Sequence, residues 1–230
     1  MCQAVFMALL CLFSPKKVSR LETTRIYNGK NMRNLVLPTR AIKVVNTSIH
    51  LFHHHGFHTV GIDKIVKESQ IPKATFYNYF HSKERFIEIC LTVQKECLKE
   101  KVVSIAEEVN RTSVTDQLKK LYFLHTDLEG PYYLLFKAIF ETKLTYPKAY
   151  QVAVRYRTWL INEIYSQLRT LKNDAFQDAK LFLYMIEGAI IQLLSSDVSI
   201  EQEKVVDCFW KGEFVVNKKC IAVCDSKIKL

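Results

Sequence analysis

The sequence predicts an all-α protein, and three observations support this fold class. Glycine and proline account for only six and five of the 230 residues, too few for the many turns of a β-sandwich or barrel. Apolar residues recur at intervals of three and four along most of the chain, the spacing of an amphipathic helix. The breaks between these segments, such as Gly130-Pro131 and Tyr146-Pro147, carry residues that commonly separate helices.

The first predicted helix begins near Thr39, spans roughly four turns and ends at Gly56, a residue type that often terminates helices. Its apolar residues step by three, four and three, so they share one face. They are Ile42, Val45, Ile49 and Phe52.

A short helix is predicted next, with Ile62, Ile65 and Val66 on its inner face. Ser69 and Gln70 end it, and a tight turn follows. Two short helices across such a turn are typical of a helix-turn-helix unit.

The second short helix is predicted to follow Pro72, whose missing N–H is no loss at a helix start. Phe76 and Phe80 lie on its inner face with Tyr79 beside them. Its outer side offers an ammonium, a hydroxyl, a phenol and an amide, which suit phosphates and base edges. The outer residues are Lys73, Ala74, Thr75, Tyr77 and Asn78.

A long helix is predicted from Ser82, a suitable N-cap, to about Asn110. Its inward residues include Phe86, Cys90 and Val93. Further helices are predicted at about 114–127, 131–142, 147–171, 174–196 and 199–211.

Helix 174–196 carries apolar residues on two faces. The first face includes Ala179, Phe182, Ile186 and Ile190, and is expected to pack inside its own domain. A helix that is apolar nearly all round must be buried on more than one side, so we expect the second face to contact a partner chain. An intramolecular core is the alternative. The predicted interface, which includes the following helix, is Leu181, Tyr184, Gly188, Ile191, Phe209 and Trp210.

Three segments resemble the N-terminal domain of the TetR family of bacterial transcriptional regulators: Gly56-Phe57, Val60 to Val66, and Pro72 to Glu84. The resemblance covers about residues 39–99, and its most specific part is the run from Lys73 to Glu84. It implies a three-helix DNA-binding domain joined by a long helix to a C-terminal helical domain for ligand binding and dimerisation.

On this basis we divide the chain into an extension (1–38), a helix-turn-helix domain (39–99), a ligand-binding and dimerisation domain (100–212) and a tail (213–230). The resemblance places Thr75, Tyr77 and Tyr79 at the DNA, Lys73 and Ala74 at the start of the recognition helix, and Lys83 on a phosphate. The full set of expected DNA-binding residues is Thr59, Lys64, Lys73, Ala74, Thr75, Tyr77, Asn78, Tyr79 and Lys83.

Two positions depart from the family pattern. Many members have a hydroxyl residue where Val60 and Gly61 stand, so Thr59 is expected to cap the first short helix instead. Tyr79 stands where histidine is frequent. A purely structural three-helix module, with Tyr77 and Tyr79 packed inside, is the alternative interpretation.

The basic excess lies where DNA binding needs it. The net charge is +10, of which residues 1–32 carry +4, residues 33–101 carry +5 and residues 102–230 carry +1. Proteins that bind phosphate backbones gain much of their affinity by releasing counterions. A solvated basic face would have the same composition, so charge by itself does not decide.

The cysteines and histidines give no strong indication of a metal site. Cys220 and Cys224 are four apart in the tail, without a nearby set of further ligands. His50 and His54 share a helix face, a spacing that can bind zinc, yet no Glu or Cys completes the set nearby in sequence. We therefore expect no metal, no cofactor, no enzyme activity, and reduced thiols in a cytoplasmic protein.

The extension contains an apolar run, residues 4–13, which is too short to span a bilayer and has no basic residue before it. We expect no membrane association. One hypothesis is that translation begins at Met32 or that residues 1–31 are a dispensable arm. The alternative is a basic arm in which Arg33 and Arg40 enter the minor groove.

The resemblance also implies a small-molecule effector bound in the C-terminal domain. The weak candidates for its contacts are Phe136, Phe140, Tyr156 and Trp159, with His125 and Arg155 as polar partners. The expected function is a ligand-responsive repressor that binds palindromic double-stranded operator DNA as a homodimer. The competing function is a helical ligand- or protein-binding module that does not bind DNA.

Overall fold

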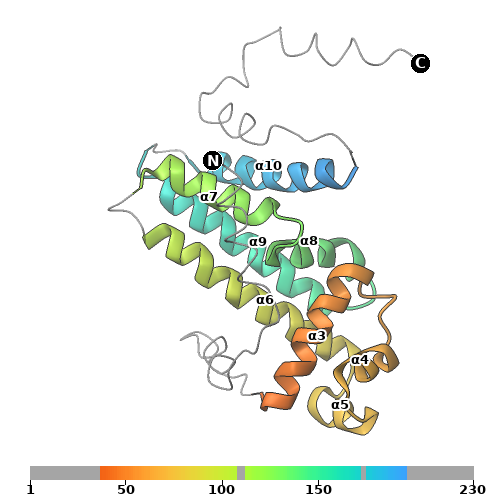
Figure 1. The fold of residues 1–230 in the computed structure, drawn as a ribbon. Helices are drawn as coiled ribbons and strands as arrows, with labels where there is room; N and C mark the ends of the chain where they lie inside the picture. The colour runs from red at the N-terminus through yellow and green to blue at the C-terminus, as the bar shows by residue number, and fades with distance from the viewer. Residues whose placement is uncertain (1–36, 108–111, 172–174, 196–230) are drawn as a thin grey trace, which may run out of the picture.

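The computed structural model describes residues 37–107, 112–171 and 175–195, and these ranges contain eight helices and no strand (Figure 1). The helices are α3 (Thr39–His55), α4 (Ile62–Ser69), α5 (Lys73–Phe80), α6 (Lys83–Ala106), α7 (Val114–Thr126), α8 (Pro131–Glu141), α9 (Pro147–Leu168) and α10 (Phe176–Ser195). This arrangement confirms the predicted fold class, with a helix-turn-helix unit first and a helical domain after it.

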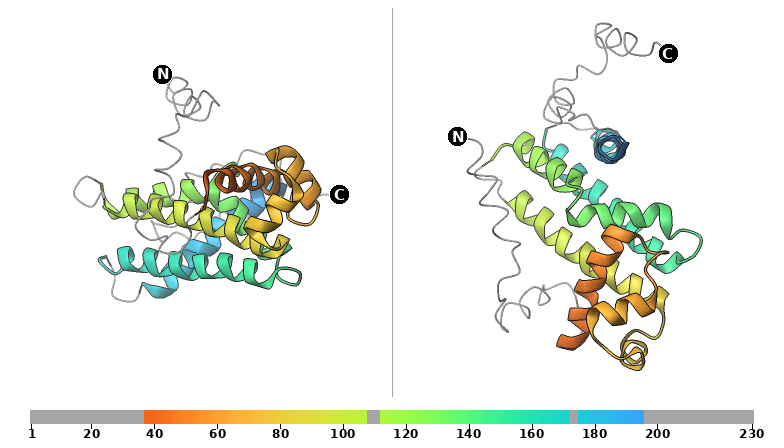
Figure 2. Two further views of the ribbon diagram at one scale, coloured as in Figure 1. Left: turned by 90° about the horizontal axis from the view of Figure 1, so that it is seen from below. Right: turned by 45° about the vertical axis from the view of Figure 1, so that its right-hand side comes forward.

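Helices α3, α4 and α5 form a small unit at one end of the molecule, and α10 lies at the other end (Figures 1 and 2). An aromatic cluster holds this unit to α6. The Phe86 ring centroid lies 4.4 Å from that of Phe80 and 4.9 Å from that of Phe76. Phe52 of α3 completes the cluster, and all four rings are fully buried.

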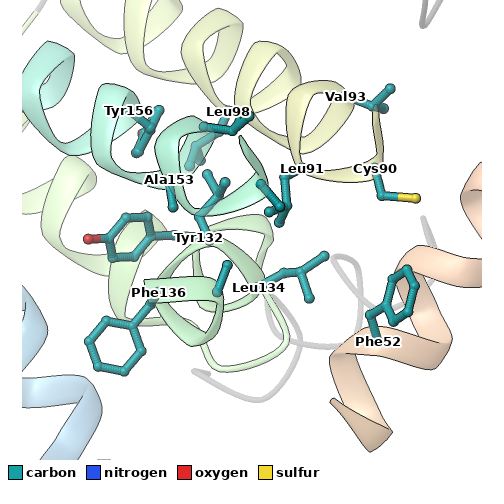
Figure 3. Packing of buried hydrophobic residues seen from close by; sticks show 14 of the residues in the cluster. Phe52, Cys90, Leu91, Val93, Leu98, Tyr132, Leu134, Phe136, Ala153 and Tyr156 are labelled. Carbon is teal, nitrogen blue, oxygen red and sulfur yellow. The ribbon is translucent and has the colours of Figure 1, made fainter. Parts of the chain in front are cut away.

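Helix α6 connects the two parts of the chain. It begins as predicted at Ser82, whose Oγ accepts the backbone N–H of Arg85 at 3.1 Å. Its side chains Leu91 and Leu98 point toward α8 and α9 (Figure 3), and Cys90 of the same helix is fully buried. Burial raises the pKa of the Cys90 thiol well above its ordinary value, so this cysteine behaves as a small apolar core residue.

Helix α10 packs on α9 and α7 through one of its two apolar faces. On this face Ala179, Phe182, Ile186 and Ile190 are fully buried. The other face, described below, is exposed. The packing of α10 against its own domain is therefore as the sequence predicts.

The predicted helix positions agree with the structure to within a few residues, but one predicted helix cap differs. Gly61 is the N-cap of α4, and no side chain accepts a hydrogen bond there. The expectation that Thr59 caps this helix is wrong, because the chain remains extended through Gly61 and α4 begins only at Ile62. The predicted helix at 199–211, with Phe209 and Trp210, the tail with Cys220 and Cys224, and the extension before Leu37 lie outside the described residues.

Within the described ranges, no helix is both long enough and apolar enough to cross a membrane.

His125 is an ionisable residue that lies fully buried in the C-terminal domain. Its Nδ1 lies 2.6 Å from the carbonyl oxygen of Leu121, and its Nε2 lies 2.7 Å from the hydroxyl of Tyr156. Burial lowers the pKa of His125 from 6.5 to about 4, because the charged imidazolium would lose its hydration. His125 is therefore neutral in the folded protein near neutral pH.

This burial predicts a specific loss of stability in mild acid. In the unfolded chain His125 is protonated below pH 6.5, whereas in the folded chain it stays neutral down to about pH 4. Its contribution to the free energy of unfolding is therefore complete above pH 6.5 and is lost as the pH falls toward 4. When the pH falls from about 8 to about 5, protonation of His125 in the unfolded chain should lower the free energy of unfolding by about 2 kcal/mol.

Urea unfolding of the wild type and the His125→Gln variant at both pH values measures this contribution. The variant should be less stable at pH 8 and show a smaller loss on acidification. An equal loss in both proteins would contradict the assignment to His125.

Candidate nucleic-acid interface

The outer face of α5 is open to solvent, whereas its inner face is locked in the core. Phe76 and Phe80 are fully buried. On the outer side Lys73, Ala74, Tyr77 and Asn78 are exposed, while Thr75 and Tyr79 are half-buried. Tyr77 exposes 41% of its surface, a large value for an aromatic residue that was a candidate for packing inside. The helix therefore presents these polar groups to solvent, and the packing of its inner face fixes its orientation.

Lys73 is engaged in an ion pair at the front of this face. Its Nζ lies 2.7 Å from Oδ1 of Asp63 on α4, and both side chains are well exposed. The hydrogen bond to Asp63 raises the pKa of Lys73 above its ordinary value. An exposed pair of this kind contributes little to stability, so a phosphate can replace Asp63 as the partner of Lys73 at low cost.

Lys83 sits differently from Lys73. It is half-buried, its Nζ donates to the carbonyl of His58 at 3.4 Å, and it lies 5.5 Å from the ring centroid of Tyr146 in the C-terminal domain. One donor of the ammonium is used by His58, and two remain for other partners such as a phosphate. Of the remaining expected residues, Thr59 is exposed and Lys64 is half-buried.

Two non-glycine residues with positive φ shape the turns on either side of α5. Gln70 adopts the left-handed conformation at φ 55°, and its N–H bonds back to the carbonyls of Val66 and Lys67. His81 has φ 62° and ends α5. Such values are uncommon outside glycine, and no glycine stands at either position to indicate them in the sequence.

The two domains are joined by a contact that sequence reasoning missed. The Glu141 carboxylate at the end of α8 accepts the backbone N–H of Phe57 at 2.7 Å, and the Glu141 carbonyl lies 2.6 Å from Nε2 of His58. Lys137 donates to the carbonyl of His53 at 3.0 Å. Helix α8 thus binds the last turn of α3 and the loop between α3 and α4. No sequence pattern indicates this contact, because the partners lie more than 80 residues apart.

The candidate ligand residues divide into two groups. His125, Phe136 and Tyr156 are buried, and His125 bonds to Tyr156. Trp159 is half-buried with its ring 5.6 Å from that of Tyr156. Phe140 is 67% exposed, and Arg155 is also exposed. The structure therefore brings the first group together and places the last two on the surface.

A second polar cluster of this domain surrounds Glu187, the one charged residue in the apolar centre of α10. Arg157 forms two hydrogen bonds with the Glu187 carboxylate, at 2.6 and 2.7 Å. The hydroxyl of Tyr132 donates to the same carboxylate at 3.0 Å. Burial, followed by the charge of Glu187, raises the pKa of Tyr132 well above its ordinary value, which keeps it a donor.

Comparison with known proteins identifies the helix-turn-helix unit. Residues 44–89, from α3 into α6, match a family described as bacterial regulatory proteins of the tetR family. These residues form a TetR-family DNA-binding domain. This match covers the helix-turn-helix unit with the buried phenylalanines and the exposed face of α5. A TetR-type DNA-binding domain on this unit supports a DNA-binding regulator.

Solved structures extend the likeness to the C-terminal domain. The reduced form of NemR from Escherichia coli is 18% identical with a TM-score of 0.66, and the match covers 74% of this chain and 95% of NemR. The TetR-family regulator SCO4454 from Streptomyces coelicolor is 20% identical with a TM-score of 0.62, covering 76% and 87%.

A regulator from Saccharomonospora viridis, solved in complex with choline, is 20% identical with a TM-score of 0.60, covering 74% of this chain and 93% of that one. At such low identity these structures show that the fold is shared, and nothing further about function. No curated protein matches the sequence significantly.

The interdomain contact makes Gly56 sensitive to substitution. Gly56 has φ +79°, and a Cβ at this position would lie 2.8 Å from the Glu141 carboxylate that binds Phe57. Gly56→Ala should therefore lower the free energy of unfolding by about 1–3 kcal/mol through backbone strain and displacement of Glu141. Urea denaturation measures the change.

Gly61→Ala is the matched control, since a Cβ at Gly61 meets no atom within 4 Å and φ there is −80°. It should cost less than about 1 kcal/mol, the loss of a favourable N-cap residue. Equal destabilisation by the two substitutions would show that the Glu141 contact does not constrain position 56.

Proposed function

We propose that this TetR-family protein is a ligand-responsive repressor that binds a palindromic operator as a homodimer. The observation that carries the proposal is the outer face of α5, where exposed Lys73, Tyr77 and Asn78 stand on a helix anchored by buried Phe76 and Phe80. Such a helix can enter the major groove, where phenol, amide and ammonium groups meet base edges and phosphates.

Dimerisation is supported by the exposed face of α10. Leu181, Tyr184 and Ile191 each expose more than half of their surface, and Gly188 on the same side is also exposed. A contiguous set of large apolar side chains is unfavourable in water and commonly marks an interface. A second copy of α10 offers the same surface and satisfies a two-fold axis.

A two-fold dimer would read two half-sites. Because α5 and α10 lie at opposite ends of each chain, pairing through α10 leaves both recognition helices free (Figure 1). Their centres should be separated by about one turn of DNA, roughly 34–36 Å, or a multiple of it. The operator should then be palindromic.

An effector would act through the C-terminal domain. The relative from Saccharomonospora viridis was solved with choline, which supports small-molecule binding in this fold. Here, His125 and Tyr156 are candidate contacts inside the domain, and α8 carries both Phe136 and the Glu141 contact to the α3–α4 loop. A ligand that shifted α8 would thereby move the DNA-binding unit, and operator binding with candidate effectors added tests this scheme.

Operator binding is tested by selecting sequences from a random DNA pool with the full-length protein. The wild type should enrich a palindrome, and Lys73→Ala should weaken binding to all sequences, because a phosphate contact carries no sequence information. The slope of log affinity against log salt should decrease by about 0.9 for each phosphate that the variant no longer neutralises.

Lys120→Ala on α7, in the C-terminal domain, is the control and should leave the slope unchanged. An unchanged slope for Lys73→Ala would refute its phosphate contact. If the wild type enriches no sequence, the chain is instead a helical binding module without DNA binding.

The dimer is tested by light scattering on size-exclusion fractions. Ile191→Lys should convert dimer to monomer, because it places two like charges in the proposed interface. Gly188→Leu should also weaken the dimer while leaving the single chain folded, since a Cβ there meets no atom within 4 Å. Leu144→Lys, at a 93% exposed apolar position off α10, is the control and should remain dimeric. A dimer that withstood both α10 substitutions would place the interface elsewhere.

A further inference from the structure

Three side chains with metal-binding atoms converge where α3 meets the turn between α7 and α8. His53 and His54 are in the last turn of α3, and Glu129 is in the turn. Their ligand atoms all lie within 4.8 Å of one another. His53 is half-buried, whereas His54 and Glu129 are exposed and can adjust. The site joins the DNA-binding unit to the C-terminal domain.

His53 supplies an independent indication. Its Nε2 is buried and has no hydrogen-bond partner within the described part of the chain. Buried polar atoms are nearly always paired, and a bound ion is one explanation for those that are not.

The surroundings fix the His53 ring and the backbone of the turn. The His53 ring packs edge-on against Tyr133 at 5.1 Å. The N–H of Glu129 donates to Oδ1 of Asp127 at 3.0 Å, which fixes the backbone of the turn.

The electrostatics favour a cation on balance. The C-terminal end of α3 carries partial negative charge, and Glu129 adds a full one. The opposing charge is that of Lys137, whose ammonium is bonded to the carbonyl of His53 and lies 3.9 Å from Glu141. That ammonium is thus partly compensated by Glu141.

We propose that His53, His54 and Glu129 form a binding site for a divalent transition-metal ion, of which Zn²⁺ fits best. Two imidazoles and one carboxylate are a common zinc ligand set, and water fills the fourth position. With bonds of about 2.0–2.1 Å, tetrahedral ligand atoms lie about 3.4 Å apart, so the side chains must close by roughly 1 Å. The ion would link α3 to the α7–α8 turn, and so restrain the DNA-binding unit relative to the C-terminal domain.

The test is titration of the metal-free, full-length protein with Zn²⁺ alone, in competition with a chromophoric chelator. Glu129→Gln and His54→Gln replace exposed groups by residues of similar size, so both variants should fold. Each should weaken Zn²⁺ binding at this site by at least about tenfold, since loss of an outer-shell partner already costs that much. Zn²⁺ should raise the melting temperature of the wild type and not that of Glu129→Gln.

Two controls separate this site from other metal-binding groups. His50→Gln/His55→Gln removes two exposed histidines of the same helix end and should bind Zn²⁺ like the wild type. Cys220→Ser/Cys224→Ser should also retain the site, and Co²⁺ bound there should lack the charge-transfer absorption of thiolate ligands.

Three results would overturn the proposal. The first is wild-type affinity in Glu129→Gln. The second is an equal loss in His50→Gln/His55→Gln, which would indicate non-specific binding by a histidine-rich surface. The third is complete loss of binding in Cys220→Ser/Cys224→Ser, which would place the metal on the tail.

Discussion

The buried ring of Phe86 is the contact on which the DNA-binding unit depends. It lies in the first turn of α6 and touches Phe76 and Phe80 of α5 and Phe52 of α3. Because close-packed rings cannot rotate independently, the direction of the recognition helix is set by the direction of α6. Any movement of α6 is therefore transmitted to α5 as a movement of a rigid body.

The C-terminal domain meets a second constraint, since it must hold one carboxylate within an apolar helix. A lone buried charge costs several kcal/mol, and Arg157 and Tyr132 offset this cost by bonding to both oxygens of Glu187. These partners come from α9 and α8, so Glu187 also fixes the register of three helices. The arrangement leaves the opposite side of α10 free to be apolar and exposed.

Much of the local structure could be predicted from the sequence, because it depends on residues close together in the chain. Ser82 caps α6 as predicted, and the spacing of Phe76 and Phe80 correctly assigned the inner face of α5. The cap of α4 was predicted wrongly, because Thr59 is a good cap residue but the backbone does not turn into a helix until Ile62.

Features that join distant segments could not be predicted. Glu141 meets Phe57, Lys83 points toward Tyr146, and Glu129 lies beside His53, yet each pair is widely separated in sequence. Neither periodicity nor capping rules describe such contacts, which depend on how whole helices pack. The exposure of Phe140 and Arg155 was hidden for the same reason, since composition does not say which face of a helix is covered.

The close approach of Gly56 to Glu141 limits how this chain can diverge in evolution. Any residue other than glycine at position 56 is strained by the positive φ whatever stands at position 141, and its Cβ would also displace the Glu141 carboxylate. A shorter side chain at position 141 would remove the acceptor of the Phe57 N–H, so both positions should drift slowly among descendants. The pair would thus record, in the sequences of its relatives, which lineages have kept this junction between the two domains.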